Sequence, residues 1–344
     1  MTANLDLAQT NSRRAGWLDR LTRSPEWFTV ALILLTSLAV GAVNPHFFEL
    51  ATVFDLLQSA TTTGIFAMGT LVVLASGGID VSFTAIAALM MYSLTKFALA
   101  LWPDAPFVLI LVAGAIGGML LGTVNGVLVH RLRAPSLIVT IGTLYLFRGV
   151  LLTFVGTLDI MNLPRSMEQF GQIPLFFYTT ADGLRAALPV SVIALVLAAI
   201  LTWWLLNRTM MGRGVYAMGG NVSIAERLGY NLRALRLFVF GYAGLLAGLA
   251  GILHASTNRL ASPFGLVGTE LDVIGAVILG GARITGGTGT VPGTLLGVAL
   301  VTLINGVLIL VGIPTTWQKV IIGAFILVAG IANALSARSR VMTT

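Results

Sequence analysis

The sequence predicts an all-α polytopic membrane protein with about ten transmembrane helices. Hydrophobic residues make up 57% of its 344 residues and charged residues only 10%, whereas about a quarter of the residues in a soluble domain are charged. Apolar runs long enough to cross a bilayer, about 20 residues each, recur along the chain. Arginines lie mainly in alternate loops between these runs, as they do when basic loops stay on the cytoplasmic side of a membrane.

Ten apolar runs qualify as transmembrane helices by length and composition. In chain order they are residues 27–43, 54–76, 82–101, 107–130, 136–156, 187–206, 236–256, 268–283, 290–311 and 316–336. The second and eighth runs are the hardest to delimit, because each borders a glycine-rich polar stretch. The runs divide the chain into a cytoplasmic N-terminal segment (1–26), a transmembrane domain (27–337) with a long cytoplasmic segment (207–235), and a cytoplasmic tail (338–344).

Ten spans place both termini on one side of the membrane, and the arginines indicate that this side is the cytoplasm. The segments that are then cytoplasmic hold fourteen arginines, and the external loops hold three. The cytoplasmic arginines are Arg13, Arg14, Arg20, Arg23, Arg131, Arg133, Arg208, Arg213, Arg227, Arg233, Arg236, Arg283, Arg338 and Arg340, and the external ones are Arg165, Arg185 and Arg259. This positive-inside asymmetry explains the net charge of +7 without a nucleic-acid partner.

The residue types needed for catalysis or metal binding are not grouped in this sequence. The absence of cysteine excludes disulfides and thiolate chemistry, and three scattered histidines do not predict a metal site. No Ser–His–Asp set or pair of carboxylates in a cleft is apparent. The glycine-rich run at residues 280–290 lacks the Gly-Lys-Ser/Thr ending of a phosphate-binding loop. It therefore predicts a tight cytoplasmic turn rather than a nucleotide site.

A polar segment at residues 207–236 interrupts the apolar sequence and contains five of the arginines. Within it, Ser223 and Glu226 have the spacing of a capping box, so a short helix is expected to begin at Ser223. Gly229 is a favourable residue to end that helix. A helix of two turns has too small an apolar face to fold alone, yet this one has signals at both ends. The segment is therefore interpreted as a docking element for a soluble partner.

Small residues repeat at intervals of four in three of the predicted spans. They are Gly114, Gly118, Gly122 and Gly126 in the fourth span, Gly244 and Gly248 in the seventh, and Gly293 and Gly297 in the ninth. This spacing puts glycines on one helix face, where two backbones can approach closely. Dense helix packing is the favoured interpretation, and a sliding surface between rocking helices is the alternative.

The sequence Asn-Gly-Val-Leu occurs twice, beginning at Asn125 and at Asn305. Pro135 follows the first copy on the cytoplasmic side, and Pro314 follows the second on the external side, so the copies run in opposite directions. This is consistent with the inverted repeats of many transporters, although chance similarity between spans rich in leucine, valine and glycine explains it equally well. A buried asparagine is costly unless paired, so both asparagines are expected to face the protein interior or a wet path.

Acidic residues are expected at the ends of spans rather than in the middle. Asp80 ends the second span, just before Ser82, and is expected to cap the third span or to form a polar break beside a solute path. Glu270 and Asp272 begin the eighth span on the external side, where acids suit a helix N-terminus.

Three glycine-rich blocks occur in an order and at a spacing that point to a known family. They are SGGIDVS at residues 76–82; GVYAMGGN, AERLG and GLLAGLAG within residues 212–251; and LGG and GGTGT within residues 270–297. From about residue 50 to its end, the chain resembles the permease subunits of bacterial ABC sugar importers, the family of the ribose, xylose, arabinose and galactose permeases. The resemblance implies a multi-pass protein of the bacterial inner membrane, surrounded by lipid.

The resemblance also implies the partners of the chain. The permease has no nucleotide site or other cofactor of its own, because ATP and Mg²⁺ bind to a separate cytoplasmic ABC ATPase. That ATPase would dock on the helix at 223–229, within the cytoplasmic segment 207–235, with Glu226 and Arg227 as contacts. A periplasmic solute-binding protein would deliver the solute, and a second copy of the chain or a sister permease would complete the pathway.

The identity of the solute is less well specified by the sequence. After Ser82 the sugar permeases usually continue with small residues including glycine, whereas this chain has Phe83 and Thr84. A pentose, hexose or similar polyol ranks first, and related permeases carry autoinducer-2, nucleosides or branched-chain amino acids. Polar residues that could line the path of an uncharged hydrophilic solute are Asp80, Ser82, Asn125, Thr140 and Asn305.

Two other classes of function are disfavoured by the sequence. A secondary transporter driven by an ion gradient would need acids inside the membrane to couple the ion, and none is expected in the middle of a span. A membrane-embedded enzyme is disfavoured because the sequence shows no catalytic set.

Overall fold

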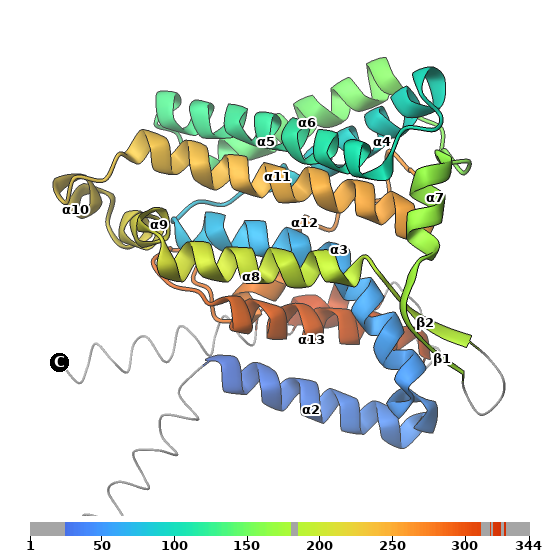
Figure 1. The fold of residues 1–344 in the computed structure, drawn as a ribbon. Coiled ribbons are helices and arrows are strands. Elements are labelled where there is room, and N and C mark those ends of the chain that lie inside the picture. The colour runs from blue at the N-terminus through green and yellow to red at the C-terminus, as the bar shows by residue number, and fades with distance from the viewer. Residues whose placement is uncertain (1–24, 180–184, 311–316, 318, 325–326, 328–344) are drawn as a thin grey trace, which may run out of the picture.

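The fold of the chain is a bundle of long apolar helices (Figure 1). The computed structural model describes residues 25–179, 185–310, 317, 319–324 and 327. Its helices are α2 (Pro25–Val43), α3 (Leu50–Ala75), α4 (Phe83–Leu101), α5 (Phe107–Leu132), α6 (Ser136–Val150), α7 (Arg165–Gln172), α8 (Val192–Arg208), α9 (Met210–Gly220), α10 (Val222–Arg227), α11 (Leu232–Asn258), α12 (Glu270–Leu279) and α13 (Val291–Leu310). A 3-10 turn follows α2 (Pro45–Phe48), and a π-helical turn extends α6 (Leu151–Val155).

Six of these helices are long and apolar enough to cross a membrane, which confirms the predicted all-α membrane fold. They are α2, α3, α4, α5, α6 with its π-helical extension, and α11. The pair α8 and α9 counts as a seventh span if its 75° bend is taken as a break within one span. Helices α12 and α13 coincide with the eighth and ninth predicted runs but are shorter in the described residues. Most of the tenth run, 316–336, lies outside the described residues, so the count of ten stays a prediction.

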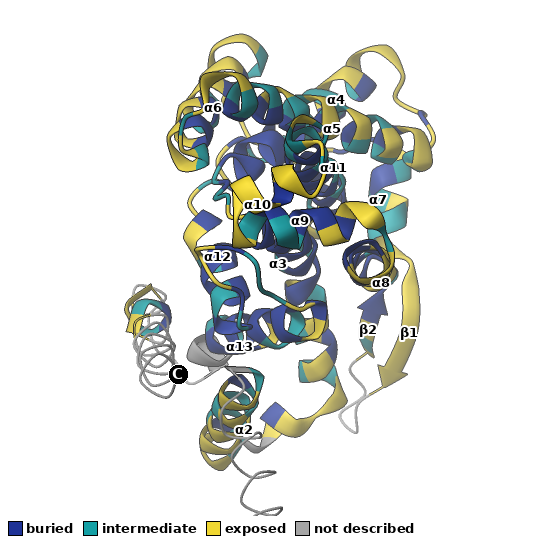
Figure 2. Cartoon of the chain, turned by 90° about the vertical axis from the view of Figure 1, so that its left-hand side faces the viewer, coloured by how far each residue is buried: buried dark blue, intermediate teal, exposed yellow. Residues whose placement is uncertain are grey.

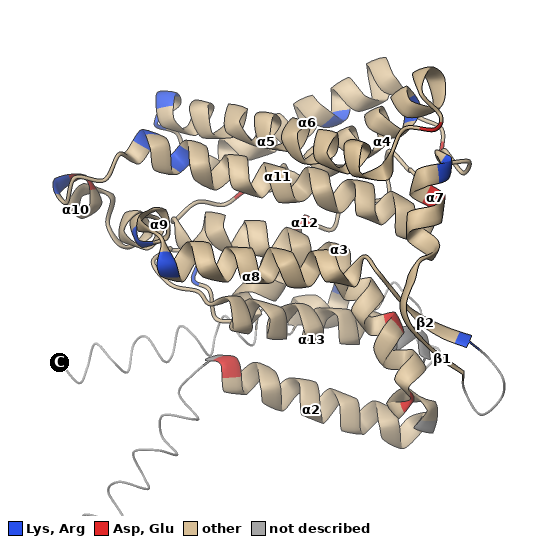
Figure 3. Cartoon of the chain, in the orientation of Figure 1, with Lys and Arg blue, Asp and Glu red and all other residues tan. Residues whose placement is uncertain are grey.

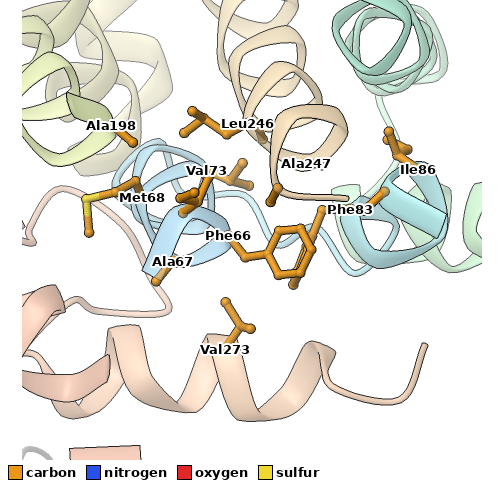
Figure 4. Packing of buried hydrophobic residues seen from close by; sticks show 14 of the residues in the cluster. Phe66, Ala67, Met68, Val73, Phe83, Ile86, Ala198, Leu246, Ala247 and Val273 are labelled. Atoms are coloured by element: carbon orange, nitrogen blue, oxygen red, sulfur yellow. The ribbon is translucent and has the colours of Figure 1, made fainter. Parts of the chain in front are cut away.

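Helices α3 and α11 lie in the centre of the bundle, and the other long helices surround them (Figure 2). The core between them is built from large buried side chains of α3, α4 and α11, among them Phe66, Met68, Phe83 and Leu246 (Figure 4). The outer helices instead turn apolar side chains away from the protein. On α2, Leu34, Leu35 and Leu38 are 58–66% exposed. A surface of this kind is stable in contact with lipid and not with water.

The glycine stripe of α5 packs directly against α11, so the packing interpretation is confirmed. A Cβ atom added to Gly118 would lie 2.2 Å from the carbonyl oxygen of Gly244, and one added to Gly122 would lie 2.2 Å from that of Phe240. The stripe of α13 is used in the same way, because a Cβ on Gly297 would lie 1.9 Å from the carbonyl oxygen of Ala276 in α12. Any larger residue would force these helices apart. The alternative of a sliding surface stays a hypothesis.

Two features interrupt the regular helices, and the first of them was not predicted. The chain between α7 and α8 forms an antiparallel hairpin of two short strands, β1 (Pro174–Thr179) and β2 (Arg185–Pro189), at one end of the bundle. In addition, α3 ends at Ala75, one residue before the end of the predicted run 54–76, and residues 76–82 form a non-helical connection to α4. The helix is terminated by Gly77, which has a left-handed backbone with φ of +81°. The N–H of Gly77 donates to the carbonyl of Leu74, and the N–H of Gly78 donates to the carbonyl of Val73.

Candidate functional site

Lysine and arginine residues are most densely grouped at the end of the bundle where α9 and α10 lie (Figure 3). Helix α9 continues from α8 after the 75° bend at Thr209. The Thr209 hydroxyl oxygen accepts a hydrogen bond from the N–H of Gly212 at 3.0 Å and so caps α9. The polar segment 207–236, in which one docking helix was predicted, therefore contains two helices, α9 and α10. The predicted helix corresponds to α10.

The boundaries of α10 correct the predicted capping box. The helix begins at Val222, and its cap is Asn221, whose Oδ1 accepts a hydrogen bond from the N–H of Ile224 at 3.1 Å. Asn221 has the extended backbone of an N-cap residue, and asparagine caps as well as serine does. Ser223 and Glu226 are instead exposed residues within the helix. The sequence signal for the start of this helix was Asn221, one turn before Ala225, and it was overlooked.

The predicted end of α10 is confirmed at Gly229, which has φ of +84°. Its N–H bonds to the carbonyl of Glu226, and the N–H of Tyr230 bonds to the carbonyl of Ala225. This pair of bonds closes a helix around a left-handed residue and satisfies two of its last carbonyls. The six-residue helix is therefore stabilised at both ends by local bonds.

The surface of α10 is suited to a protein partner. Only Ala225 is buried, whereas the side chains of Val222, Ile224 and Leu228 are 42–67% exposed. Apolar side chains gathered on a short polar segment mark an interaction surface. Beside α10, a pocket of about 560 Å³ opens between the end of α5 and the start of α11. Its lining includes Arg133, Glu226, Tyr230, Arg233 and Arg236.

Helix α9 rests on the end of the central helix α3. A Cβ atom added to Gly219 would lie 2.0 Å from the carbonyl oxygen of Ala75, the last residue of α3. The same carbonyl accepts a hydrogen bond from the N–H of Gly287 at 3.0 Å, and the Tyr216 hydroxyl donates to the carbonyl of Gly289 at 2.7 Å. The glycine-rich run 280–290 thus forms a turn that packs against α9, as the sequence predicted.

Four of the five predicted pathway residues lie around the connection between α3 and α4. Asp80 Oδ1 accepts hydrogen bonds from both the N–H and the hydroxyl of Ser82, each at 2.7 Å. The Asn125 side-chain N–H of α5 donates to the Ser82 hydroxyl oxygen at 2.7 Å. All three side chains are buried. Asp80 therefore fixes the connection through Ser82 rather than capping α4 directly, which corrects the first of its two predicted roles.

Helix α6 holds the other side of this connection. The Ser136 hydroxyl oxygen accepts from the N–H of Ile79 at 2.8 Å, and the Thr140 hydroxyl donates to the carbonyl of Ile79 at 3.3 Å. Thr140 was predicted as a pathway residue, whereas Ser136 was missed, because nothing in its local sequence distinguishes it from a residue that begins a helix. Asn305 lies on α13, which α3 and α11 separate from α5 (Figure 1). Its role stays a prediction.

Carboxylates lie deeper than the sequence suggested. Asp80 is 2% exposed and Glu270 is 9% exposed. Burial raises the pKa of the Asp80 carboxyl, and the hydrogen bonds from Ser82 offset part of the rise. Glu270 accepts from the Thr84 hydroxyl and from the N–H of Gly268. Both acids lie at the ends of helices, as expected, since Asp80 precedes α4 and Glu270 begins α12. Their burial was not predicted from the sequence.

The chain is thus an apolar helical bundle with a short capped helix at its arginine-rich end and with polar groups buried where α3 ends. These features are typical of the membrane subunit of a transporter. The particular family follows from comparison with known proteins. Residues 52–330 match the family described as "Branched-chain amino acid transport system / permease component", and the chain belongs to this family.

Curated relatives cover most of the chain. It is 31% identical to the ribose import permease protein RbsC of Haemophilus influenzae, over 88% of this chain and 91% of the relative. It is 33% identical to RbsC of Bacillus subtilis, over 86% of this chain and 89% of the relative. It is 34% identical to the autoinducer 2 import system permease protein LsrC of Yersinia pestis, over 87% and 82%. No solved structure matches the chain.

Proposed function

We propose that this chain is the permease subunit of an ATP-binding-cassette importer that moves a monosaccharide-like solute from the periplasm to the cytoplasm across a bacterial inner membrane. The observation that carries the proposal is α10, a helix that is capped at both ends and exposed at every residue except Ala225, at the arginine-rich end of the bundle. The ribose import permeases, which align with nearly nine-tenths of the chain, support the class of solute.

The partners follow from the same surface. A cytoplasmic ABC ATPase docks on α10, with Ser223, Glu226 and Arg227 among its contacts, and Gly229 ends the helix that it grips. Acidic side chains of the ATPase suit the arginines in the pocket beside α10. The chain needs no cofactor of its own, because ATP and Mg²⁺ bind to the ATPase, and it needs no nucleic acid. The chain is a transport subunit and not an enzyme.

Three further features complete the proposal. The chain crosses the membrane ten times with both termini in the cytoplasm, which the gathering of arginines at one end of the bundle supports. A periplasmic solute-binding protein docks at the opposite end. A second copy of the chain, or a sister permease, pairs with it within the lipid bilayer. ATP binding and hydrolysis in the partner move α10 and so tilt the spans between outward and inward openings.

Autoinducer-2 is the second candidate solute, because the chain is as similar to an autoinducer 2 import permease as it is to ribose permeases. Branched-chain amino acids, which the name of the family mentions, and nucleosides are further alternatives. A secondary transporter driven by an ion gradient is the alternative from another class, and the buried Asp80 and Glu270 give it two acids to test.

The proposal is tested by purifying the tagged chain from its native membrane in a mild detergent and identifying the proteins that come with it. An ATPase and a periplasmic binding protein are expected. Glu226→Ala should weaken capture of the ATPase at least about tenfold, which corresponds to about 1.4 kcal/mol, with normal membrane insertion. Asp104→Ala, at an exposed acid outside the docking segment, is the matched control.

The opposite result would be equally clear. A chain that purifies alone and transports solute in liposomes without ATP is a secondary carrier. If uptake then stops on neutralising Asp80 or Glu270, ion coupling is the better explanation. Unchanged ATPase capture by Glu226→Ala would remove that residue from the docking surface.

A further inference from the structure

A polar pocket lies between the two central helices, near the end of the bundle opposite α10. Its volume is about 220 Å³, below the range of about 300–1,000 Å³ that drug-sized ligands fill. The lining comes from α3, from the last turns of α11 and from the loop before α12. Polar side chains in it are Gln58, Ser59, Thr61, Thr62, Thr63, His254, Thr257, Asn258 and Thr269. No lysine, arginine, aspartate or glutamate lines it.

Two hydroxyl groups of the pocket offer acceptors to a ligand. Thr61 and Thr269 donate their hydroxyl protons to the backbone carbonyls of Leu57 and Leu266. Their oxygen lone pairs then remain to accept hydrogen bonds. Such acceptors suit the O–H donors of a polyol. A carboxylate is less well suited, because the lining holds no lysine or arginine to compensate its charge.

His254 adds a ring whose orientation is fixed by two neighbours. The Asn258 side-chain N–H lies 3.2 Å from Nδ1 of His254, and the Thr62 hydroxyl lies 3.5 Å from the same atom. An amide N–H can only donate, so Nδ1 accepts, and the proton of the neutral ring is on Nε2. The pocket thus combines hydroxyls, amides and one imidazole, the groups that recognise a neutral hydrophilic molecule.

An aromatic pair closes the inner end of this pocket. Phe66 lines the pocket and packs against Phe83, with the ring centroids 5.1 Å apart (Figure 4). Phe83 follows Ser82 of the buried polar cluster, and Thr84 donates its hydroxyl proton to Glu270. The pair therefore connects the pocket to the segment that carries Asp80 and Ser82.

We propose that this pocket is a solute-binding site within a single copy of the chain, and that it accepts a neutral polyhydroxylated molecule rather than a zwitterionic amino acid. The proposal rests on the proposed transport function and narrows its solute class. The uncharged polar walls bind the hydroxyl groups, and Phe66, backed by Phe83, forms an apolar floor for the carbon face of the solute. Passage toward the polar cluster then requires this pair to separate.

The natural absence of cysteine makes the site directly testable. Thr62→Cys is expected to react with a charged, membrane-impermeant methanethiosulfonate reagent added from outside intact cells. The matched control is Thr70→Cys, on the same helix two turns further in, where the hydroxyl is buried beyond the pocket. The control should not react. Equal reactivity of the two variants, or none at Thr62→Cys, would overturn the pocket as a site open to solute.

The class of solute is tested on the purified full chain by protection of Thr62→Cys from the same reagent. High millimolar D-ribose, D-xylose, L-arabinose or D-galactose is expected to slow labelling at least about fivefold for one of these sugars, and L-leucine should not. Protection by leucine, or by none of the four sugars, overturns the proposed class. Failure of the transport proposal is separate, because it shows as a missing ATPase in the purification, whereas labelling needs neither ATP nor partner.

Discussion

Replacing Gly219 by alanine should separate docking of the ATPase from transport. Gly219 lies in the last turn of α9, where its backbone contacts the end of α3. An added Cβ would lie 2.0 Å from the carbonyl oxygen of Ala75 and 2.6 Å from the nitrogen of Gly287, whereas real Cβ contacts are essentially never closer than 3.0 Å. Helix α9 must therefore move by about 1 Å, and the bond between Gly287 and Ala75 is disturbed.

The cost of this displacement can be estimated from overpacking elsewhere. Forcing one extra methyl group into a close backbone contact costs about 1–3 kcal/mol, which lowers the thermal midpoint of a domain of this size by a few degrees. The matched control is Gly220→Ala, because a Cβ at the next residue meets nothing within 4 Å. The docking surface of α10 is untouched by either substitution.

Three measurements on both variants decide the outcome. Capture of the ATPase should equal that of the unmodified chain in both. Uptake into proteoliposomes at saturating ATP should fall several-fold in Gly219→Ala alone, together with the thermal midpoint of the detergent-solubilised complex. The reasoning is refuted if Gly219→Ala transports as well as Gly220→Ala, because the contact between α9 and α3 would then carry no coupling.

Two further substitutions test the local structure of the site. Asn221→Ala removes the N-cap of α10 and should cost about 1 kcal/mol of helix stability, seen as faster hydrogen exchange in residues 222–227. Ser223→Ala should leave that exchange unchanged. Faster exchange in Ser223→Ala than in Asn221→Ala would instead support Ser223 as the N-cap. Ser82→Ala leaves the buried amide of Asn125 without its partner and should cost about 1–3 kcal/mol. An unchanged midpoint of thermal unfolding in that variant would show that water replaces the hydroxyl group.

The sequence predicted those features that depend on short stretches of chain. The bilayer requires long apolar helices, so composition and run length located α2 to α6, α8 and α11 within a few residues. Gly229 was identified correctly, because a left-handed residue at a helix end favours glycine strongly. The helix start was placed wrongly, because Asn221 and Ser223 have similar capping strength and local sequence does not choose between them.

The contacts that assemble the site could not be predicted in the same way. The bond from Thr84 to Glu270 joins residues 186 positions apart, and that from Ile79 to Ser136 joins residues 57 apart. Such pairs depend on how the spans pack, and packing of apolar helices is encoded weakly by any single residue. Asp80 illustrates the limit, since its position beside two glycines indicated a break, but only the fold shows that the break is buried.

The arrangement of these contacts indicates how motion could pass from one end of the bundle to the other. Gly219 of α9 contacts the last carbonyl of α3, that of Ala75, and the connection that begins at the next residue carries Asp80 and Ser82. Phe83 follows directly and packs on Phe66, the floor of the proposed solute pocket. Closely packed interiors shift between discrete arrangements rather than deforming gradually. If α9 is displaced and moves this connection, Phe83 must therefore be repositioned as well. Gly219→Ala and Thr62→Cys thus test the two ends of one chain of contacts. If solute still protects Thr62→Cys when combined with Gly219→Ala, but uptake is lost, the defect lies in coupling and not in recognition.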